Sequence, residues 1–312
     1  MKIIRSPESM SDLALRAVRN GKAIGLVPTM GALHEGHASL IRQARAENKI
    51  VVVSIFVNPT QFGPKEDFKK YPRKLAVDAK LCRKEKVDII FYPEAAKIYP
   101  EGYRTYVNVE GLSEGLCGKS RPGHFRGVVT VVAKLFNIVR PDRAYFGQKD
   151  AQQAVIIRRM CEDLNFPVCI RLMPTVREAG GLAMSSRNAY MSCREKKEAL
   201  VLARSLSLAE YLVKNGLTDT GRLIRLMRNI IERKEAVKID YVAVVDAQTL
   251  KPLKKISGDC LIAVAVWIGK TRLIDNILIK MSPRHHVPDV KSGSRPTPTY
   301  RRGSVGTPRH HV

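Results

Sequence analysis

The chain has 312 residues, of which 45% are hydrophobic, so it can bury a sizeable core. Its formal net charge of +25 favours partners such as nucleic acid, acidic membrane surfaces or phosphorylated small molecules, but no run of five or more basic residues marks a nucleic-acid arm. The longest strongly apolar run, 260–269, has about half of the roughly 20 residues that a membrane-spanning helix needs, so we expect no membrane span.

The cysteines and the N-terminus indicate a compartment. The first ten residues, MKIIRSPESM, lack the apolar centre of a signal peptide. The six cysteines are scattered, without a CxxC pair or other metal-type spacing. We therefore expect a cytoplasmic protein with reduced thiols.

Strand and helix patterns alternate along the first half of the chain. Short apolar, β-branched segments predict strands that are buried on both faces, at 22–28, 50–57, 87–93, 143–150 (with a loop) and 168–175. Amphipathic segments predict helices at 37–47, 75–86, 127–141 and 151–164. Such alternation implies right-handed βαβ crossovers and therefore a doubly wound parallel sheet of the α/β class.

The character of the sequence changes after residue 176. Two long helical runs, 194–216 and 220–234, precede three apolar segments that predict a small antiparallel sheet, at 238–246, 260–269 and 271–279. We expect a first domain at 1–176 and a smaller α+β C-terminal domain at 177–280.

Residues 281–312 form a different kind of segment. They are rich in Ser, Pro, Gly and Arg, hold six Lys/Arg against one Asp, and repeat PRHHV. Such a segment cannot bury enough apolar surface to offset its ordering entropy, which predicts a disordered basic tail. A metal site built from its paired histidines is an open alternative.

Two histidines stand three residues apart in VPTMGALHEGHASL, residues 27–40. His37 falls at the start of a predicted helix, and His34 in the loop before it. Backbone N–H groups at a helix N-terminus favour a phosphate, and imidazoles can donate protons or hydrogen bonds as charge builds on it. The alternative is that the pair only caps the helix and packs.

Polar residues also follow two other predicted strands. Asn58 and Gln61 come after 50–57, and uncharged amides there suit a hydroxy acid. Lys149, Asp150 and Gln153 follow 143–150, where the lysine suits phosphate and the aspartate suits ribose hydroxyls. Ordinary solvated turns are the alternative for both clusters.

Two further clusters are less defined. GLAMSSRNAY, 181–190, offers two hydroxyls and Arg187 as donors to phosphate, or serves only as a linker between domains. SRPGHFRGV, 120–128, adds Arg121, His124 and Arg126 without a clear role. A Gly-rich Walker loop is absent from the sequence, which argues against kinase-type transfer through that device.

Together these motifs resemble one family. PTMGALHEGH, NPTQFG, YPR, RPGHFRGV, RPDRAYFGQKDAQQ, TVREAGGLAMSSRN and DNILI, in this order, resemble the pantoate–β-alanine ligases (pantothenate synthetases) over residues 1–280. The resemblance implies a Rossmann-like domain related to nucleotidylyltransferases with HIGH-type signatures. It implies the ATP-dependent condensation of (R)-pantoate with β-alanine through a pantoyl-adenylate, releasing AMP and pyrophosphate, in pantothenate and coenzyme A biosynthesis. It also implies a Mg²⁺-dependent homodimer.

The resemblance assigns roles to particular residues. It implies that His37 is the proton donor, that His34, Lys149 and Arg187 act beside it on the phosphates, and that the 177–280 domain closes as a lid. Gln61 matches a glutamine that holds pantoate and lies near β-alanine, and Gln153 matches a second pantoate contact. The implied ATP-binding residues are Met30, Gly31, Ala32, Leu33, His34, Glu35, Gly36, His37, Gly147, Gln148, Lys149, Asp150, Val176, Met184, Ser185, Ser186 and Arg187. The metal ligands are unknown, with Asp78 only as a candidate.

Two positions depart from the family pattern, and two other functions stay open. Gly180 stands where the family carries an aspartate, and Ala151 where an aromatic residue is common. One alternative is another HxxH nucleotidylyltransferase, which would not need the two glutamines. The other is a basic nucleic-acid-binding protein, which would bind DNA or RNA in a salt-dependent way.

Overall fold

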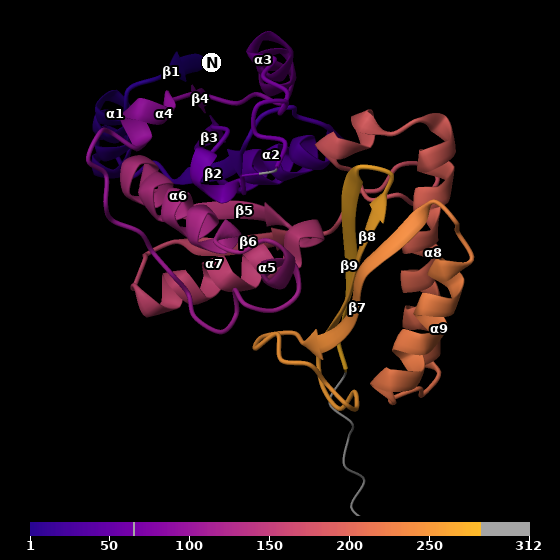
Figure 1. Ribbon diagram of the computed structural model, residues 1–312. Coiled ribbons are helices and arrows are strands. Elements are labelled where there is room, and N and C mark those ends of the chain that lie inside the picture. Colours follow the sequence, from indigo (N-terminus) through magenta and orange to yellow (C-terminus); the bar gives the residue numbers. More distant parts are fainter. Residues whose placement is uncertain (65, 282–312) are drawn as a thin grey trace, which may run out of the picture. The chain divides into compact units, whose positions relative to one another are not determined.

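A computed structural model describes residues 1–64 and 66–281 (Figure 1). It contains a six-stranded sheet of order β1-β4-β3-β2-β5-β6, in which neighbouring strands run parallel. The strands are β1 (Lys2–Ile4), β2 (Ile24–Thr29), β3 (Ile50–Ile55), β4 (Ile89–Phe91), β5 (Arg143–Gly147) and β6 (Cys169–Met173).

Helices cover both faces of this sheet. One face packs against α1 (Pro7–Arg19), α6 (His124–Val139) and α7 (Ala151–Asp163), and the other against α2 (Glu35–Glu47) and α3 (Leu75–Lys84). Successive residues of a strand point to opposite faces, so Leu26 joins the first apolar cluster and Val27 the second. The prediction of a doubly wound parallel sheet is confirmed.

The centre of the sheet is where ligand-binding residues are expected. From β2 the chain builds β3 and β4 on one side, whereas β5 and β6 lie on the other. The crevice between β2 and β5 is therefore a topological switch point, at which open α/β sheets bind ligands beyond the carboxyl ends of their strands. The loops that follow β2, β3 and β5 all begin at this edge.

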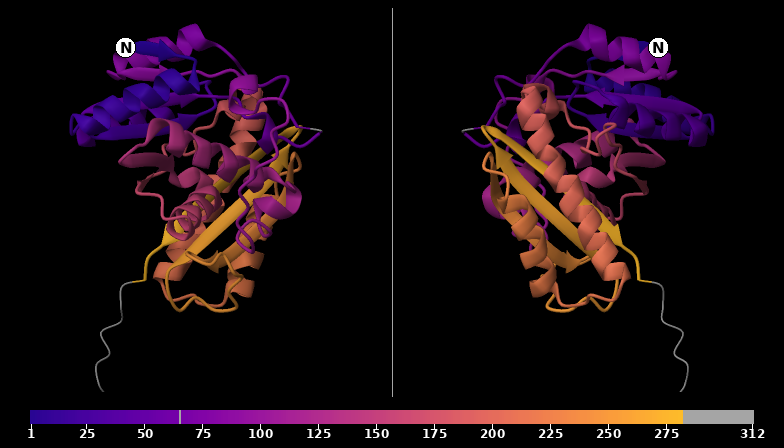
Figure 2. Two further views of the ribbon diagram at one scale, coloured as in Figure 1. Left: turned by 90° about the vertical axis from the view of Figure 1, so that its left-hand side faces the viewer. Right: turned by 90° about the vertical axis from the view of Figure 1, so that its right-hand side faces the viewer.

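A second, antiparallel sheet follows later in the chain. Its strands β7 (Val237–Asp246), β8 (Cys260–Ile268) and β9 (Thr271–Ile279) have the order β7-β8-β9. The helices α8 (Cys193–Lys214) and α9 (Thr220–Glu232) run along this sheet (Figure 2). Leu261 and Ala263 of β8 pack against Ala151 at the start of α7. β8 is buried along almost its whole length. The predicted small α+β unit is confirmed, and the boundary at residue 176 stays a prediction.

Some elements differ from the expectation. β1 and α1 were not expected, because β1 is a three-residue edge strand and is mostly exposed. The start of α1 does carry a local signal, since Ser6 caps it and Pro7 occupies its first turn. The short elements are α4 (Ala95–Ile98), α5 (Cys117–Ser120) and the 3₁₀ turns η1 (Pro59–Gln61), η2 (Gln148–Asp150) and η3 (Ser186–Tyr190).

Two expectations concern the limits of the described chain. From residue 282 on, the predicted tail and its paired histidines lie outside the described residues. Within the described residues, no helix combines the length and apolar character needed to cross a bilayer.

Candidate active site

The loop after β2 is held in an unusual shape by a buried carboxylate. Gly31 and Ala32 both have positive φ, 84° and 50°. Asp78 of α3, only 2% exposed, accepts hydrogen bonds from the backbone N–H groups of Ala32 (3.1 Å) and Leu33 (2.8 Å). Both oxygens of Asp78 therefore face the loop. The residue considered as a metal ligand instead holds the backbone of the loop.

The two histidines cap the first turn of α2. His34 is the N-cap residue, and its Nδ1 accepts from the Gly36 N–H at 3.1 Å. Nδ1 of His37 accepts in turn from the His34 N–H at 3.3 Å, and the ring centroids lie 4.1 Å apart. A neutral imidazole whose Nδ1 accepts must carry its proton on Nε2. The capping and functional interpretations therefore do not exclude each other, since capping leaves an Nε2–H donor on each ring.

The electrostatics keep both rings neutral. Burial, followed by the charge of Lys149, lowers the pKa of His34 to about 4. Burial, followed by His34 and then Lys149, lowers the pKa of His37 to about 3. Without a bound anion, both imidazoles are uncharged hydrogen-bond donors at neutral pH.

The amides after β3 form a buried cluster. Nδ2 of Asn58 donates to Oε1 of Gln61 (3.0 Å), while Oδ1 of Asn58 accepts from the Tyr99 hydroxyl (2.9 Å). Nε2 of Gln61 lies 3.1 Å from Sδ of Met30. Because a thioether is a weak acceptor, this N–H group is readily exchanged for a better partner.

The segment after β5 supplies a cation and a second amide. Lys149 is 20% exposed at its side chain and lies 3.8 Å from the carboxylate of Asp150. Gln153 follows on the first turn of α7 and lines the same cavity as Lys149. This is the arrangement expected of residues at the switch point.

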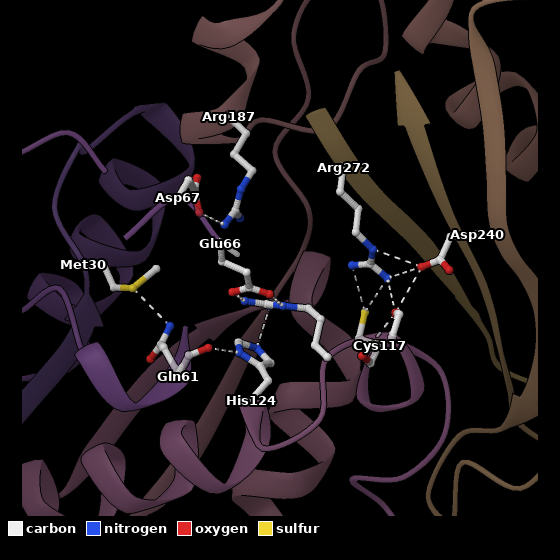
Figure 3. A network of polar contacts seen from close by, with 11 residues as sticks. Met30, Gln61, Glu66, Asp67, Cys117, His124, Arg187, Asp240 and Arg272 are labelled. Carbon is white, nitrogen blue, oxygen red and sulfur yellow. Dashed lines mark hydrogen bonds and ion pairs between the residues drawn. The ribbon is translucent and has the colours of Figure 1, made fainter. Parts of the chain in front are cut away.

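The serine-rich segment lies near this cavity as well. The backbone N–H of Met184 donates to the carbonyl of Val176 (2.9 Å), and Ser185 caps η3. Nη2 of Arg187 donates to Oδ1 of Asp67 at 3.2 Å (Figure 3). Asp67 therefore engages Nη2 of Arg187, and this nitrogen must leave Asp67 if it is to contact a phosphate.

One cavity of about 250 Å³ brings these clusters together. His37, Lys149 and Arg187 all line it, so the candidate catalytic residues do not face separate surfaces. The predicted site residues along its walls are Met30, His34, Gly36, His37, Gln61, Gly147, Lys149, Asp150, Gln153, Val176, Met184, Ser185, Ser186 and Arg187. A larger cavity of about 440 Å³ shares Lys149, Gln153 and Arg187 with it and extends towards β8 and β9.

Five predicted ATP-binding residues do not line the 250 Å³ cavity: Gly31, Ala32, Leu33, Glu35 and Gln148. Glu35 is exposed and pairs with Arg42. Nε2 of Gln148 donates to Oδ1 of Asn276 (2.9 Å).

Comparison with known proteins identifies the family. The sequence profile of the family described as pantoate-beta-alanine ligase matches residues 2–278. The chain belongs to the pantoate–β-alanine ligase family. The pantothenate synthetase of Moorella thermoacetica is 55% identical to it over 282 residues, which are 90% of this chain and 100% of that protein. The pantothenate synthetase of Thermotoga neapolitana is 55% identical over 279 residues, or 89% and 100% of the two chains.

Solved structures of this family have the same fold. The pantothenate synthetase of Thermus thermophilus is similar with a TM-score of 0.85 and 43% identity, covering 89% of this chain and 99% of that one. The pantoate-beta-alanine ligase of Francisella tularensis, in complex with beta-gamma ATP and beta-alanine, has a TM-score of 0.73 and 35% identity, over 89% and 97% of the two chains.

The two departures from the ligase pattern have local structural settings. A β-carbon added to Gly180 would lie 3.1 Å from Cδ2 of Leu200, so α8 packs closely beside this position. Ala151 is buried against Leu261 and Ala263 of β8 and lines the larger cavity. An aromatic side chain there would occupy part of that cavity.

Residues of β9 support the candidate site, although sequence reasoning gave them no role. Nδ2 of Asn276 donates to the carbonyls of Gln148 (3.0 Å) and Lys149 (2.9 Å), which holds the turn that carries Lys149. Asp275, 2% exposed, pairs with Arg177 at 2.7 Å. Two adjacent polar residues between the apolar residues of β9 were the signal available in the sequence.

Proposed function

We propose that this chain is a pantoate–β-alanine ligase that condenses (R)-pantoate with β-alanine and converts ATP to AMP and pyrophosphate. The observation that carries the proposal is one cavity in which the two histidines that cap α2, together with Lys149 and Arg187, meet two glutamines, in a chain of this family. The cations suit a triphosphate, and the glutamines suit a hydroxy acid.

The first task of the site is to reduce charge repulsion. The carboxylate of pantoate must approach the α-phosphorus of an anionic triphosphate. The Nε2–H groups of His34 and His37 donate to phosphate oxygens, and Lys149 and Arg187 add positive charge. Because the two histidine rings are held before ATP binds, each of these donors can contribute about 3 kcal/mol to the stabilisation of the developing charge.

Bound ATP changes the state of His37. A nearby anion favours the protonated imidazole, so the triphosphate raises a pKa that burial has lowered to about 3. In the ternary complex His37 can then supply a proton to the departing pyrophosphate. Lys149 opposes this shift, since its charge lowers the same pKa.

The glutamines position the acid. We propose that Nε2 of Gln61 leaves Sδ of Met30 for an oxygen of pantoate, and that Gln153 contacts a second oxygen. Holding the carboxylate next to the α-phosphorus can supply about 7 to 11 kcal/mol of the barrier reduction.

The reaction then has two steps. A carboxylate oxygen of pantoate bonds to the α-phosphorus, and the bond to the β-phosphate oxygen breaks, which releases pyrophosphate. The neutral amine of β-alanine attacks the carbonyl of the adenylate, AMP leaves, and the amine loses a proton. The larger cavity adjoins Lys149 and Gln153, and we propose that β-alanine enters through it.

We propose that magnesium binds at this site together with ATP. Within the described residues, no group of three His, Cys, Asp or Glu side chains is placed to hold a metal ion. Mg²⁺ commonly binds one or two carboxylates together with substrate phosphates, and Asp150, 49% exposed beside Lys149, can supply one. When bound, Mg²⁺ would neutralise part of the triphosphate charge.

The remaining expectations rest on the family. We propose a homodimer, which light scattering coupled to size-exclusion chromatography tests. We also propose a cytoplasmic location, which suits the six free cysteines. The family membership and the two glutamines argue against the nucleotidylyltransferase and nucleic-acid-binding alternatives.

One assay tests the activity. The protein is incubated with ATP, Mg²⁺, pantoate and β-alanine, and AMP formation is expected to depend on both organic substrates. His37→Ala should lower the rate of adenylation by about a hundredfold or more without loss of the fold. Gln61→Ala should raise the KM for pantoate far more than that for ATP. AMP formation that does not depend on pantoate would contradict the proposal. Normal turnover by the His37→Ala variant would show that His37 has no role in the reaction.

A further inference from the structure

A chain of polar contacts ends on the backbone of Gln61 (Figure 3). Nδ1 of His124 lies 2.8 Å from the carbonyl oxygen of Gln61. Its other ring nitrogen, Nε2, lies 2.9 Å from Nη1 of Arg121. Arg121 binds Glu66 with two hydrogen bonds of 2.6 Å, from Nε and Nη2.

These contacts determine the protonation of His124. A carbonyl oxygen only accepts, so Nδ1 carries the proton, and a guanidinium only donates, so Nε2 carries a lone pair. If the His124 ring were protonated, its Nε2–H group and the N–H of Arg121 would both be donors and would point at each other. Burial, with the charge of Arg121 next in weight, lowers the pKa of His124 to about 4, in agreement with the neutral ring.

The same end of α6 holds the rest of the turn that carries Gln61. Nδ2 of Asn58 donates to the carbonyl of Gly127 at 3.0 Å. A β-carbon on Gly127 would lie 2.4 Å from the carbonyl oxygen of Thr60, so helix and turn are in direct contact. His124 therefore supplies a polar contact to Gln61, the last residue of the tightly packed turn η1.

We infer that His124 is a positioning residue: held by Arg121 and Glu66, it fixes the Gln61 peptide and so directs the Gln61 amide at pantoate. The inference rests on the proposed function, because it takes pantoate as the ligand of Gln61. His124 lines both cavities, but it acts here through Gln61 rather than on the reacting atoms.

The test separates pantoate binding from ATP binding. His124→Ala should raise the KM for pantoate about tenfold, the effect of losing one well-placed hydrogen bond, and change the KM for ATP less than about twofold. His124→Asn keeps an N–H close to the position of Nδ1 and should recover most of this loss. Arg126→Ala is the matched control, since Arg126 is an exposed residue of the same helix that stacks on Tyr106.

A double variant tests whether His124 acts through Gln61. In Gln61→Ala, which lacks the amide, adding His124→Ala should raise the KM for pantoate no further. The inference would be overturned if the two substitutions together raised the KM for pantoate by the product of their single effects. It would also be overturned if His124→Ala raised the KM values for ATP and pantoate equally, or if His124→Asn were as impaired as His124→Ala. If the unmodified protein formed no AMP in a pantoate-dependent way, the proposed function itself would be overturned. Failure of the inference and failure of the proposed function are therefore distinguishable. Thermal unfolding of each variant checks that it is folded.

Discussion

Removing the carboxylate of Asp78 should loosen the loop that is proposed to bind ATP. Its two oxygens accept from the N–H groups of Ala32 and Leu33, and Ala32 has a positive φ of 50°. Left-handed backbone costs a residue with a β-carbon about 1–2 kcal/mol, so the loop needs such contacts to keep its shape. Asp78→Ala removes both acceptors, whereas Asp78→Asn keeps one.

The structure bounds the size of the effect. Leaving a buried N–H group without an acceptor costs about 1–3 kcal/mol. Ala32 and Leu33 are only partly buried, so water can replace part of the lost bonding. Burial also raises the pKa of Asp78, which shows that the ionised form is costly, and this cost disappears in the variant. We expect a loss in the free energy of unfolding of about 2 kcal/mol for Asp78→Ala and about half of that for Asp78→Asn.

Two measurements check this expectation. Urea unfolding should show the ranked losses in stability, and steady-state assays should show a KM for ATP that rises about three- to tenfold in Asp78→Ala. The KM for β-alanine should change little. Unchanged stability together with a higher Mg²⁺ requirement would refute the reasoning and make Asp78 a metal ligand instead.

Two further predictions follow from charged groups. Asp67→Asn frees Arg187 from a partly exposed ion pair, which is worth up to about 1 kcal/mol. The KM for ATP should therefore fall by up to about fivefold. A rise in that KM would show instead that Asp67 orients Arg187 for ATP. In the folded protein the pKa values of His34, His37 and His124 are lowered to about 4, 3 and 4. As the pH falls, these histidines therefore take up protons in the unfolded chain before they do so in the folded one. The free energy of unfolding should therefore decrease by about 2 kcal/mol or more between about pH 6.5 and pH 5, as followed by urea titrations. His37→Gln should flatten this slope, and an equal slope in that variant would contradict the assignment.

Local patterns in the sequence determined most of the fold. Apolar β-branched runs and amphipathic segments predicted the strands from β2 onward and the long helices from α2 onward, with ends that differ by a few residues. These patterns suffice because the period of side-chain burial is a property of neighbouring residues. The start of α2 at the two histidines was readable for the same reason. β1 was missed, since three mostly exposed residues carry no burial period.

Only the tertiary structure decided how the candidate site is held together. Asp78 lies beneath the loop of Ala32, 46 residues away in the chain. His124 meets Gln61 across 63 residues, and Asn276 reaches Lys149 across 127. A sequence motif reports which groups are present, but the proton position on His124 depends on the Gln61 carbonyl, a partner that folding brings within 2.8 Å. Such pairings follow from sheet order and helix packing, which no local period encodes.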